Sequence, residues 1–291
     1  MDLPDVHDRV LRWYADHARD LPWRAVDATP WGVLVSELML QQTPVVRVLP
    51  VWHAWMEQWP TPADLAAAPT GEAVRAWGRL GYPRRALRLH AAAVAITERH
   101  GGEVPDDLAE LRALPGVGDY TAAAVASFAF GQRHVVLDTN VRRVLGRAFA
   151  GKELPGPSVT RAERDLATGL LPDDDETSAA WAVGVMELGA LVCPVADPRC
   201  GACPLEDVCA WHTGGRPAYD GPVRKVQTYA GTDRQCRGRL LAVLRDDPEP
   251  VHRSRLEVVW TEDVQRERCL AGLIDDGLVE ALPGSMYALP G

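Results

Sequence analysis

Lysine is almost missing from this sequence of 291 residues. Lys152 and Lys225 are the only two, and arginine supplies the rest of the 31 basic side chains. A reaction through a lysine amine therefore has only these two residues to use. The sequence also lacks a run of about 20 apolar residues, which a membrane-spanning helix needs. Its acidic start, Met1-Asp2-Leu3-Pro4-Asp5, does not resemble a secretory signal. These absences predict a soluble, intracellular protein without a membrane partner.

Positive charge is in short supply as well. The 31 Lys and Arg residues stand against 40 Asp and Glu, which gives a formal net charge of −9. An acidic protein is an unusual partner for nucleic acid. Binding to DNA needs a basic face rather than a basic protein, however, so the net charge does not exclude it. With 47% hydrophobic and 24% charged residues, the composition is that of a globular protein.

Most of the chain has the apolar periodicity of helices, interrupted by Pro and Gly. Helices are expected at residues 31–42, 45–58, 72–80, 84–99, 106–113, 120–130, 141–150, 161–171 and 178–192. After a Gly- and Pro-rich linker, further helices are expected at 237–245, 253–260 and 264–276, and then two short strands within 277–289. Three helices followed by a hairpin is the order of a winged helix. The fold prediction is therefore all-α with a small winged-helix-like α+β unit at the C-terminus.

Four cysteines gather in one short segment, with the spacing Cys193-x6-Cys200-x2-Cys203-x5-Cys209. Without an export signal, such a group holds a metal more often than it forms disulfides. Zinc is one alternative, although four-cysteine zinc sites usually pair two short knuckles across a longer spacer. A single Cys-x2-Cys flanked by unequal single cysteines favours an iron–sulfur cluster. Cys236 and Cys269 are expected to be small buried apolar residues.

The segment Leu114-Pro115-Gly116-Val117-Gly118 lies between two expected helices. Its glycines allow a sharp turn that presents backbone N–H groups at the start of a helix. We expect Gly116, Val117 and Gly118 to hold a DNA phosphate without reading a base. A lone Gly-x-Gly is usually an ordinary connection, but the flanking Leu-Pro and the following Tyr120-Thr121-Ala122 indicate a helix-hairpin-helix.

Two carboxylates stand out by their surroundings. Glu37 lies in Val33-Leu34-Val35-Ser36-Glu37-Leu38-Met39-Leu40, where poor solvation is expected to raise its pKa and make it a proton donor. An exposed stripe would be the alternative, but this helix leaves little room for one. Asp138 follows a short apolar run and opens a helix, so it is expected to cap that helix. An active-site role is compatible with capping, and the helix N-terminus would keep the aspartate ionised.

Taken together, the motifs closely resemble those of the MutY-type adenine DNA glycosylases in the endonuclease III superfamily. The resemblance covers about residues 1–215. Six motifs of this chain match those of the family in order and spacing: Leu21-Pro22-Trp23-Arg24, Ser36 to Thr43, Leu80-Gly81-Tyr82, Leu114 to Gly118, Asp138-x-Asn140-Val141 and the four cysteines.

The resemblance implies two helical domains beside a DNA-binding cleft. Residues 29–134 would form a six-helix barrel with the helix-hairpin-helix. Residues 1–28 and 135–215 would form an iron–sulfur domain, with a 4Fe-4S cluster on Cys193, Cys200, Cys203 and Cys209. A linker at 216–225 and a winged-helix-like domain at 226–291 complete the expected organisation.

The function implied is the removal of adenine mispaired with 8-oxoguanine or guanine in double-stranded DNA, as a step of base excision repair. The adenine must leave the stack to be reached. Glu37 would protonate it, and Asp138 would stabilise the oxocarbenium-like sugar, as in the two-carboxylate chemistry of sugar hydrolases. The family places Tyr120 and Asn140 around the base and sugar. It also implies an adenine pocket at Trp23, Arg24 and Leu40, and a wedge on the 8-oxoguanine side at Gln42, Thr43, Leu80 and Tyr82.

Arginines 84, 85, 88, 142, 143 and 147 are candidate phosphate contacts, although solvated helix faces explain them almost as well. Relatives that act on pyrimidines place a nucleophilic lysine where this chain has Tyr120, so base removal without efficient strand cleavage is expected. Mismatch glycosylases for thymine or uracil opposite guanine also carry tyrosine there, and Gln41-Gln42-Thr43 favours adenine. A non-enzymatic iron–sulfur regulator is a further alternative, but it would need neither Glu37 nor Asp138.

Residues 226–291 are too few for the Nudix-like domain that inspects 8-oxoguanine in many relatives. Recognition of 8-oxoguanine is therefore expected to depend on the wedge residues or on the C-terminal unit. The protein is expected to be a monomer in the cytoplasm, associated with the nucleoid.

Overall fold

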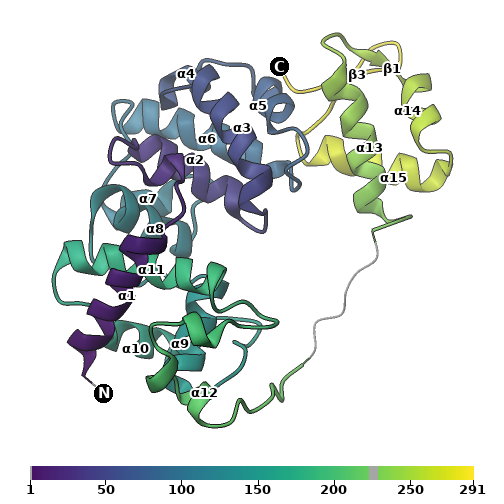
Figure 1. The fold of residues 1–291 in the computed structure, drawn as a ribbon. Coiled ribbons are helices and arrows are strands. Elements are labelled where there is room, and N and C mark those ends of the chain that lie inside the picture. Colours follow the sequence, from purple (N-terminus) through teal and green to yellow (C-terminus); the bar gives the residue numbers. More distant parts are fainter. Residues whose placement is uncertain (1, 223–228) are drawn as a thin grey trace. The chain divides into compact units, whose positions relative to one another are not determined.

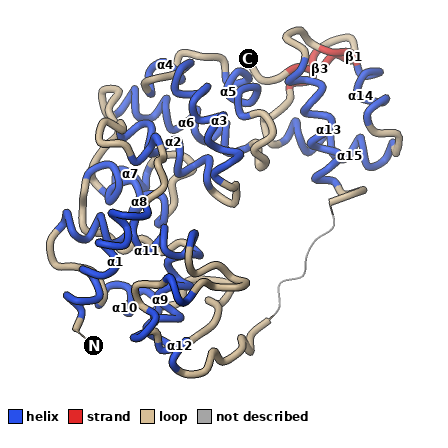
Figure 2. Tube along the Cα trace, viewed as in Figure 1, coloured by secondary structure: helices blue, strands red, loops and turns tan. Residues whose placement is uncertain are grey.

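The computed structural model describes residues 2–222 and 229–291 and is mostly helical (Figure 1). Part of the predicted linker and the first residues of the predicted C-terminal domain, 223–228, lie outside the described residues, as does Lys225. Among the described residues, no helix is both long and apolar enough to span a membrane. Strands occur in the described chain only near its C-terminal end (Figure 2).

The chain divides into two compact units. The first unit comprises Met1–Val33, Asp106–Arg112 and Gly118–Val223, and the second comprises Leu34–Pro105, Ala113–Val117 and Arg224–Gly291. The first contains α1 (Leu3–His17), η1 (Pro22–Arg24), α8 (Asp119–Phe130), α9 (Thr139–Ala150), α10 (Arg161–Gly169), α11 (Asp175–Leu191), η2 (Cys200–Ala202), η3 (Glu206–Val208) and α12 (Ala210–Thr213). Helices α2 (Pro30–Leu40) and α7 (Leu108–Ala113) each begin in the first unit and end in the second.

The core of the first unit forms where α1, α9 and α11 pack together. Val6, Val10 and Trp13 supply the apolar face of α1, at the three- and four-residue spacing of an amphipathic helix. Helix α1 was not predicted from the sequence. Asp138 caps the N-terminus of α9, as predicted, and accepts a hydrogen bond from Val141 N at 2.6 Å.

The second unit contains α3 (Val45–Gln58), α4 (Pro62–Ala66), α5 (Thr70–Trp77) and α6 (Arg84–Arg99). Trp55 lies at its centre, in edge-to-face contact with Trp59 and Trp77 at centroid distances of 4.7 and 5.8 Å. The short helix α4 was not predicted, and it begins with a capping box between Thr61 and Asp64.

The C-terminal part of the second unit has the elements α13 (Asp233–Asp246), β1 (Val251–His252), α14 (Arg253–Val259), α15 (Asp263–Asp275), β2 (Glu280–Leu282) and β3 (Met286–Ala288). The strands are antiparallel in the order β1-β3-β2, with Val251 opposite Tyr287. The three predicted helices and the hairpin are confirmed here, whereas β1 was not predicted. Cys236 and Cys269 are 0% and 2% exposed, as expected for small core residues.

Candidate active site and metal centre

Glu37 lies on α2, a helix that is apolar on nearly all sides. Its neighbours Leu34, Val35 and Met39 are all 0% exposed, and Glu37 itself is 6% exposed. A helix with apolar residues all round belongs in a core, and the carboxyl group is carried into the core with it. The predicted burial of Glu37 is therefore confirmed. Leu40, in the last turn of the same helix, is half-buried.

The four predicted wedge residues form one cluster in the second unit. Tyr82 Oη donates to Gln42 Oε1 at 3.1 Å, and both residues are exposed. Thr43 and Leu80 are 6% and 4% exposed, and Thr43 Oγ1 donates to Leu80 O at 3.3 Å. Gln42 and Tyr82 thus reach solvent, while Thr43 and Leu80 hold the two segments together from inside.

The glycine-rich turn connects α7 to α8 along the chain. Gly116 has a φ of 83°, and a Cβ at this position would lie 2.8 Å from the Cβ of Arg88. Only glycine fits that backbone without strain. Val117 N donates to Leu114 O at 3.1 Å, so a phosphate contact at Val117 would compete with this turn bond. Gly118 is the N-cap of α8, and its carbonyl accepts from Ala122 N at 2.9 Å.

Asp138 is held by two side-chain hydrogen bonds at the start of α9. Besides the bond from Val141 N, its Oδ2 accepts from Asn140 Nδ2 at 2.9 Å. Burial raises the pKa of Asp138 above its ordinary value, although these hydrogen bonds and the nearby Arg143 act in the opposite direction. The helix N-terminus was expected to favour the ionised form, and burial acts against that effect.

A chain of hydrogen bonds runs from Asp138 toward the cysteine segment. Asn140 Oδ1 accepts from Arg143 Nη2 at 2.8 Å, and Arg143 Nε donates to Cys193 O at 2.7 Å. Gly189 lies against Asn140, and a Cβ on this glycine would stand 2.7 Å from the Cβ of Asn140. Arg142, Arg143 and Arg147 were predicted as candidate phosphate contacts, but all three are buried and donate to carbonyl groups of the chain itself. The support from Gly189 was not predicted, because helical spacing does not show which helices approach closely.

Trp23 and Arg24 form η1 in the first unit. Trp23 is 5% exposed, and Arg24 Nη1 donates to Glu187 Oε2 at 2.8 Å. Arg19 adds three bonds to the same carboxylate, from its backbone N to Oε1 at 3.0 Å, from Nε to Oε1 at 2.6 Å and from Nη2 to Oε2 at 2.7 Å. Burial alone would raise the pKa of Glu187, but the bonds and charges of the two arginines outweigh it and lower the pKa to about 2.

Glu187 was missed, although its signal matches the one that identified Glu37. It is the only carboxylate of α11 beyond the first turn, next to Met186 and Leu188, and its side chain is 0% exposed. Tyr120, on α8, is half-buried beside a small cluster that contains Ala123, Val136 and Ala182.

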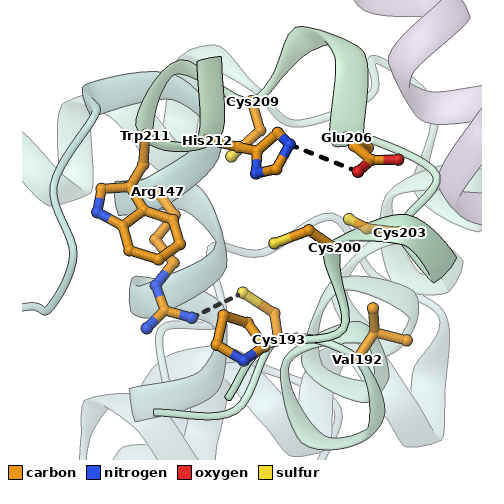
Figure 3. Close-up of a pocket in the computed structure, with 10 residues that line it drawn as sticks. Arg147, Val192, Cys193, Cys200, Cys203, Glu206, Cys209, Trp211 and His212 are labelled. Carbon is orange, nitrogen blue, oxygen red and sulfur yellow. Dashed lines mark hydrogen bonds and ion pairs between the residues drawn. The ribbon is translucent and has the colours of Figure 1, made fainter. Parts of the chain in front are cut away.

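The four predicted metal ligands surround one pocket in the first unit (Figure 3). They come from the chain after α11, from η2 and its C-cap, and from the residue before α12. Arg147 is fully buried beside them, stacks on Trp211 at 4.5 Å, and donates from Nη1 to Cys193 Sγ at 3.2 Å. Burial raises the pKa of the Cys203 thiol to about 12, and the other cysteines add to this.

The donor set and the geometry fit different kinds of metal group. Within the residues that the structure describes, no three His, Cys, Asp or Glu side chains are gathered closely enough to hold a single metal ion. Four-coordinate zinc needs four sulfurs at about 2.3 Å from one centre. The four thiols line a common pocket and are donors of the kind that metal groups take as ligands.

Comparison with known proteins gives a consistent picture. Residues 35–168 match the family model for HhH-GPD superfamily base excision DNA repair proteins. The chain is 53% identical over 284 residues to an adenine DNA glycosylase of Mycobacterium tuberculosis (strain ATCC 25618 / H37Rv), covering 97% of this chain and 92% of that protein.

Two solved structures share the fold. A thermostable thymine-DNA glycosylase has a TM-score of 0.64 and 26% identity, covering 73% of this chain and 97% of that one. A non-covalent endonuclease III–DNA complex has a TM-score of 0.62 and 25% identity, covering 74% of this chain and 98% of that one.

Proposed function

The chain belongs to the adenine DNA glycosylases of the HhH-GPD superfamily, and on this premise we propose that it hydrolyses the N-glycosidic bond of adenine mispaired with 8-oxoguanine or guanine. The observation that carries the proposal is Glu37, a carboxyl group 6% exposed on an apolar helix. A poorly solvated carboxyl group keeps its proton closer to neutral pH. It can then donate that proton to a base that has been flipped out of the duplex.

The second carboxylate has a different task. A sugar that loses its base develops positive charge, which an aspartate at a fixed position stabilises. Asp138 is fixed by Val141 N and by Asn140, and Arg143 holds Asn140 in turn. Burial raises its pKa, and a cationic sugar next to it would favour the ionised form.

The base and its former partner would meet different sets of residues. We assign adenine to Trp23, Arg24 and Leu40, with Glu187 orienting Arg24 through the ion pair at 2.8 Å. The opposite base would be read by the exposed pair of Gln42 and Tyr82, while the buried Thr43 and Leu80 support that pair. Tyr120 replaces the lysine of lyase-type relatives, so efficient strand cleavage is not expected.

We propose a 4Fe-4S cluster on the four cysteines. When bound, such a cluster joins the four thiolates and so fixes the loop from residue 193 to 209. Arg147, which donates to Cys193 Sγ, would stabilise a thiolate ligand there. Anaerobically purified protein should contain about four iron and four sulfide per chain, and stoichiometric zinc would contradict the assignment.

We also propose domains at 1–28 with 135–215, at 29–134 and at 226–291, with a linker at 216–225. The protein would be a monomer that binds double-stranded DNA in the cytoplasm, near the nucleoid. For residues 226–291 we propose a winged helix, because its elements follow in the order α13, β1, α14, α15, β2, β3 and its three strands form one antiparallel sheet. The arginines of this part form many internal ion pairs, such as Arg268 with Asp233 at 2.7 Å and Arg253 with Glu267 at 2.6 Å, which makes it a poor DNA clamp.

A base-release assay tests the function. Duplexes with A:8-oxoguanine, A:G, T:G or an oxidised pyrimidine are incubated with the protein and then treated with alkali. We expect alkali-dependent cleavage at adenine, greatest opposite 8-oxoguanine. Glu37→Gln and Asp138→Asn should each lower it by roughly 100-fold or more, the usual effect of removing a group of this kind.

Glu98→Gln is the matched control, because Glu98 is an exposed carboxylate at the far end of α6. It should leave base release unchanged. Cleavage at thymine instead of adenine would replace the proposal with the activity named for the structural neighbour. No cleavage in any duplex would contradict the enzyme assignment.

A further inference from the structure

Arg85 lies in the first turn of α6 and was grouped with the phosphate-binding candidates. The structure buries it instead, with 5% of the residue exposed. Burial lowers its pKa to about 10, so the guanidinium remains charged near neutral pH. Its neighbours in the sequence differ, since Arg84 and Arg88 are both exposed. A buried arginine of this kind binds parts of its own chain.

One nitrogen of Arg85 binds the end of the helix that carries Glu37. Nη1 donates to Leu38 O at 2.9 Å, Met39 O at 3.1 Å and Gln41 O at 2.6 Å. The last carbonyls of a helix have no partner within the helix, and a cation there is favourable. Leu38 directly follows Glu37, so the guanidinium fixes the turn next to the proposed proton donor.

The other nitrogen binds both wedge segments. Nη2 donates to Thr43 Oγ1 at 3.0 Å and to Gly81 O at 3.1 Å, which are the neighbours of Gln42 and Tyr82. Gln42 and Tyr82 have φ values of 56° and 48°. Residues with side chains adopt such conformations rarely and keep them only when the surroundings hold them. One guanidinium therefore supports both strained residues.

We propose that Arg85 is a positioning residue that links the reading of the base opposite adenine to the placement of Glu37. The inference rests on the proposed function, because it gives a role to the wedge and the proton donor of that reaction. An arginine suits this task because its planar group directs several N–H donors at once, whereas lysine offers a single compact charge. A wedge that fits 8-oxoguanine would then hold the end of α2 in the arrangement that catalysis needs.

The test compares Arg85→Lys and Arg85→Met with Arg99→Met. Arg99 is exposed at the other end of the same helix and controls for the loss of a charge from α6. Base release is measured in single turnovers with enzyme in excess, on A:8-oxoguanine and A:G duplexes. We expect the ratio of the two rates to fall about tenfold in Arg85→Lys, because lysine keeps the charge but loses the fork. Arg99→Met should keep the ratio of the wild type.

The salt dependence of DNA binding separates positioning from phosphate contact. Loss of a phosphate contact would lower the slope of log Kd against log salt by about one. We expect the slope in Arg85→Lys to equal that of the wild type. A reduced slope together with equal rate losses on both duplexes would overturn the proposal.

Two further measurements keep the test valid if Arg85→Met does not fold. Thr43→Val removes the hydroxyl that Arg85 binds on the wedge side and leaves the carbonyls of α2 in place. A double variant combines Thr43→Val with Arg85→Lys. If Arg85 acts through Thr43, the ratio of base release on A:8-oxoguanine to that on A:G should fall no further in the double variant than in Arg85→Lys alone.

Hydrogen exchange at residues 38–43 and 80–82 should be faster in Arg85→Lys, and this readout needs no activity. If the wild type released no adenine, the proposed function would fail while the exchange result still tested the contacts. An active wild type whose exchange and rate ratio are both unchanged in Arg85→Lys would overturn the proposal for Arg85 alone.

Discussion

Glu37 and Glu187 are two buried glutamates whose surroundings suit them to different roles. Both are buried on helices with many apolar residues, at 6% and 0% exposure. Arg19 and Arg24 hold Glu187 ionised, with a pKa of about 2. For Glu37, a raised pKa remains a prediction from the sequence. Glu187 is a charged anchor because Arg19 and Arg24, which are distant in the chain, bind it. Glu37 is proposed to act as an acid because its helix is apolar on nearly all sides.

The low pKa of Glu187 predicts how the stability of the protein depends on pH. Because the folded pKa lies below the ordinary value of 4.5, the carboxylate stabilises the fold above that pH, and the stability is lost as pH falls toward about 2. The shift corresponds to roughly 3 kcal/mol. Urea unfolding between pH 6 and pH 3, as approximate set points, should therefore show the gap between wild type and Glu187→Gln shrinking on acidification.

Glu98→Gln serves as the control for this measurement, since an exposed carboxylate should show no such convergence. A gap between wild type and Glu187→Gln that stays constant with pH would mean that the carboxylate does not carry the stabilisation.

At the scale of elements, α11 decides where the start of α9 can lie. Gly189 allows Asn140 to approach so closely that a Cβ would stand 2.7 Å from the Cβ of Asn140 and 3.0 Å from its carbonyl oxygen. Asn140 in turn holds Asp138. The contact between two helices therefore reaches the proposed active site through one side chain.

Gly189→Ala should displace the start of α9 and weaken catalysis more than DNA binding. Overpacking of this kind costs about 1–3 kcal/mol in stability. We expect base release in single turnovers to fall at least tenfold, about 1.4 kcal/mol in activation free energy, while Kd for the mispaired duplex changes little. Gly169→Ala is the control, because a Cβ there meets nothing within 4 Å. Equal release by both variants would show that the close approach has no catalytic role.

Most of the longer helices were predictable because their apolar pattern and the flanking Pro and Gly lie within or beside the helix itself. The expected helices at 45–58 and 84–99 agree with α3 and α6 in the structure. Helix α4 has five residues, too few for a periodic pattern, and β1 has two residues that are defined only by pairing with β3. Elements of that length depend on tertiary contacts that no local pattern contains.

At the scale of the whole molecule, the C-terminal part of the second unit is attached to the rest of that unit through α5. Arg75 Nη1 donates to Leu244 O at 3.3 Å and Asp247 O at 3.0 Å, and it also contacts Arg245 O. Gly71 N donates to Pro290 O at 2.7 Å. The Arg75 bonds join α5 to the end of α13, and the Gly71 bond joins the start of α5 to the last residues of the chain. This part of the molecule is therefore more than an appendage on a linker.

Gly71→Ala should loosen this attachment, because a Cβ there would lie 2.4 Å from Pro290 O and 2.9 Å from Leu289 Cβ. The expected result is faster hydrogen exchange at 286–290 and a lower melting temperature, from a cost of about 1–3 kcal/mol. Gly169→Ala should change neither. Exchange at wild-type rates in Gly71→Ala would mean that the tail does not dock there in solution.

The sequence by itself determined most of the helices, the cap at Asp138, the group of four cysteines and the family, because each depends on residues near one another or on motif order. Only the tertiary structure showed that Arg85 turns inward, that Glu187 anchors Arg24 and that Gly189 admits Asn140. These relations join residues separated by about 40 to more than 160 positions. The physical reason is that burial and partners depend on which surfaces meet, and local spacing leaves that choice open.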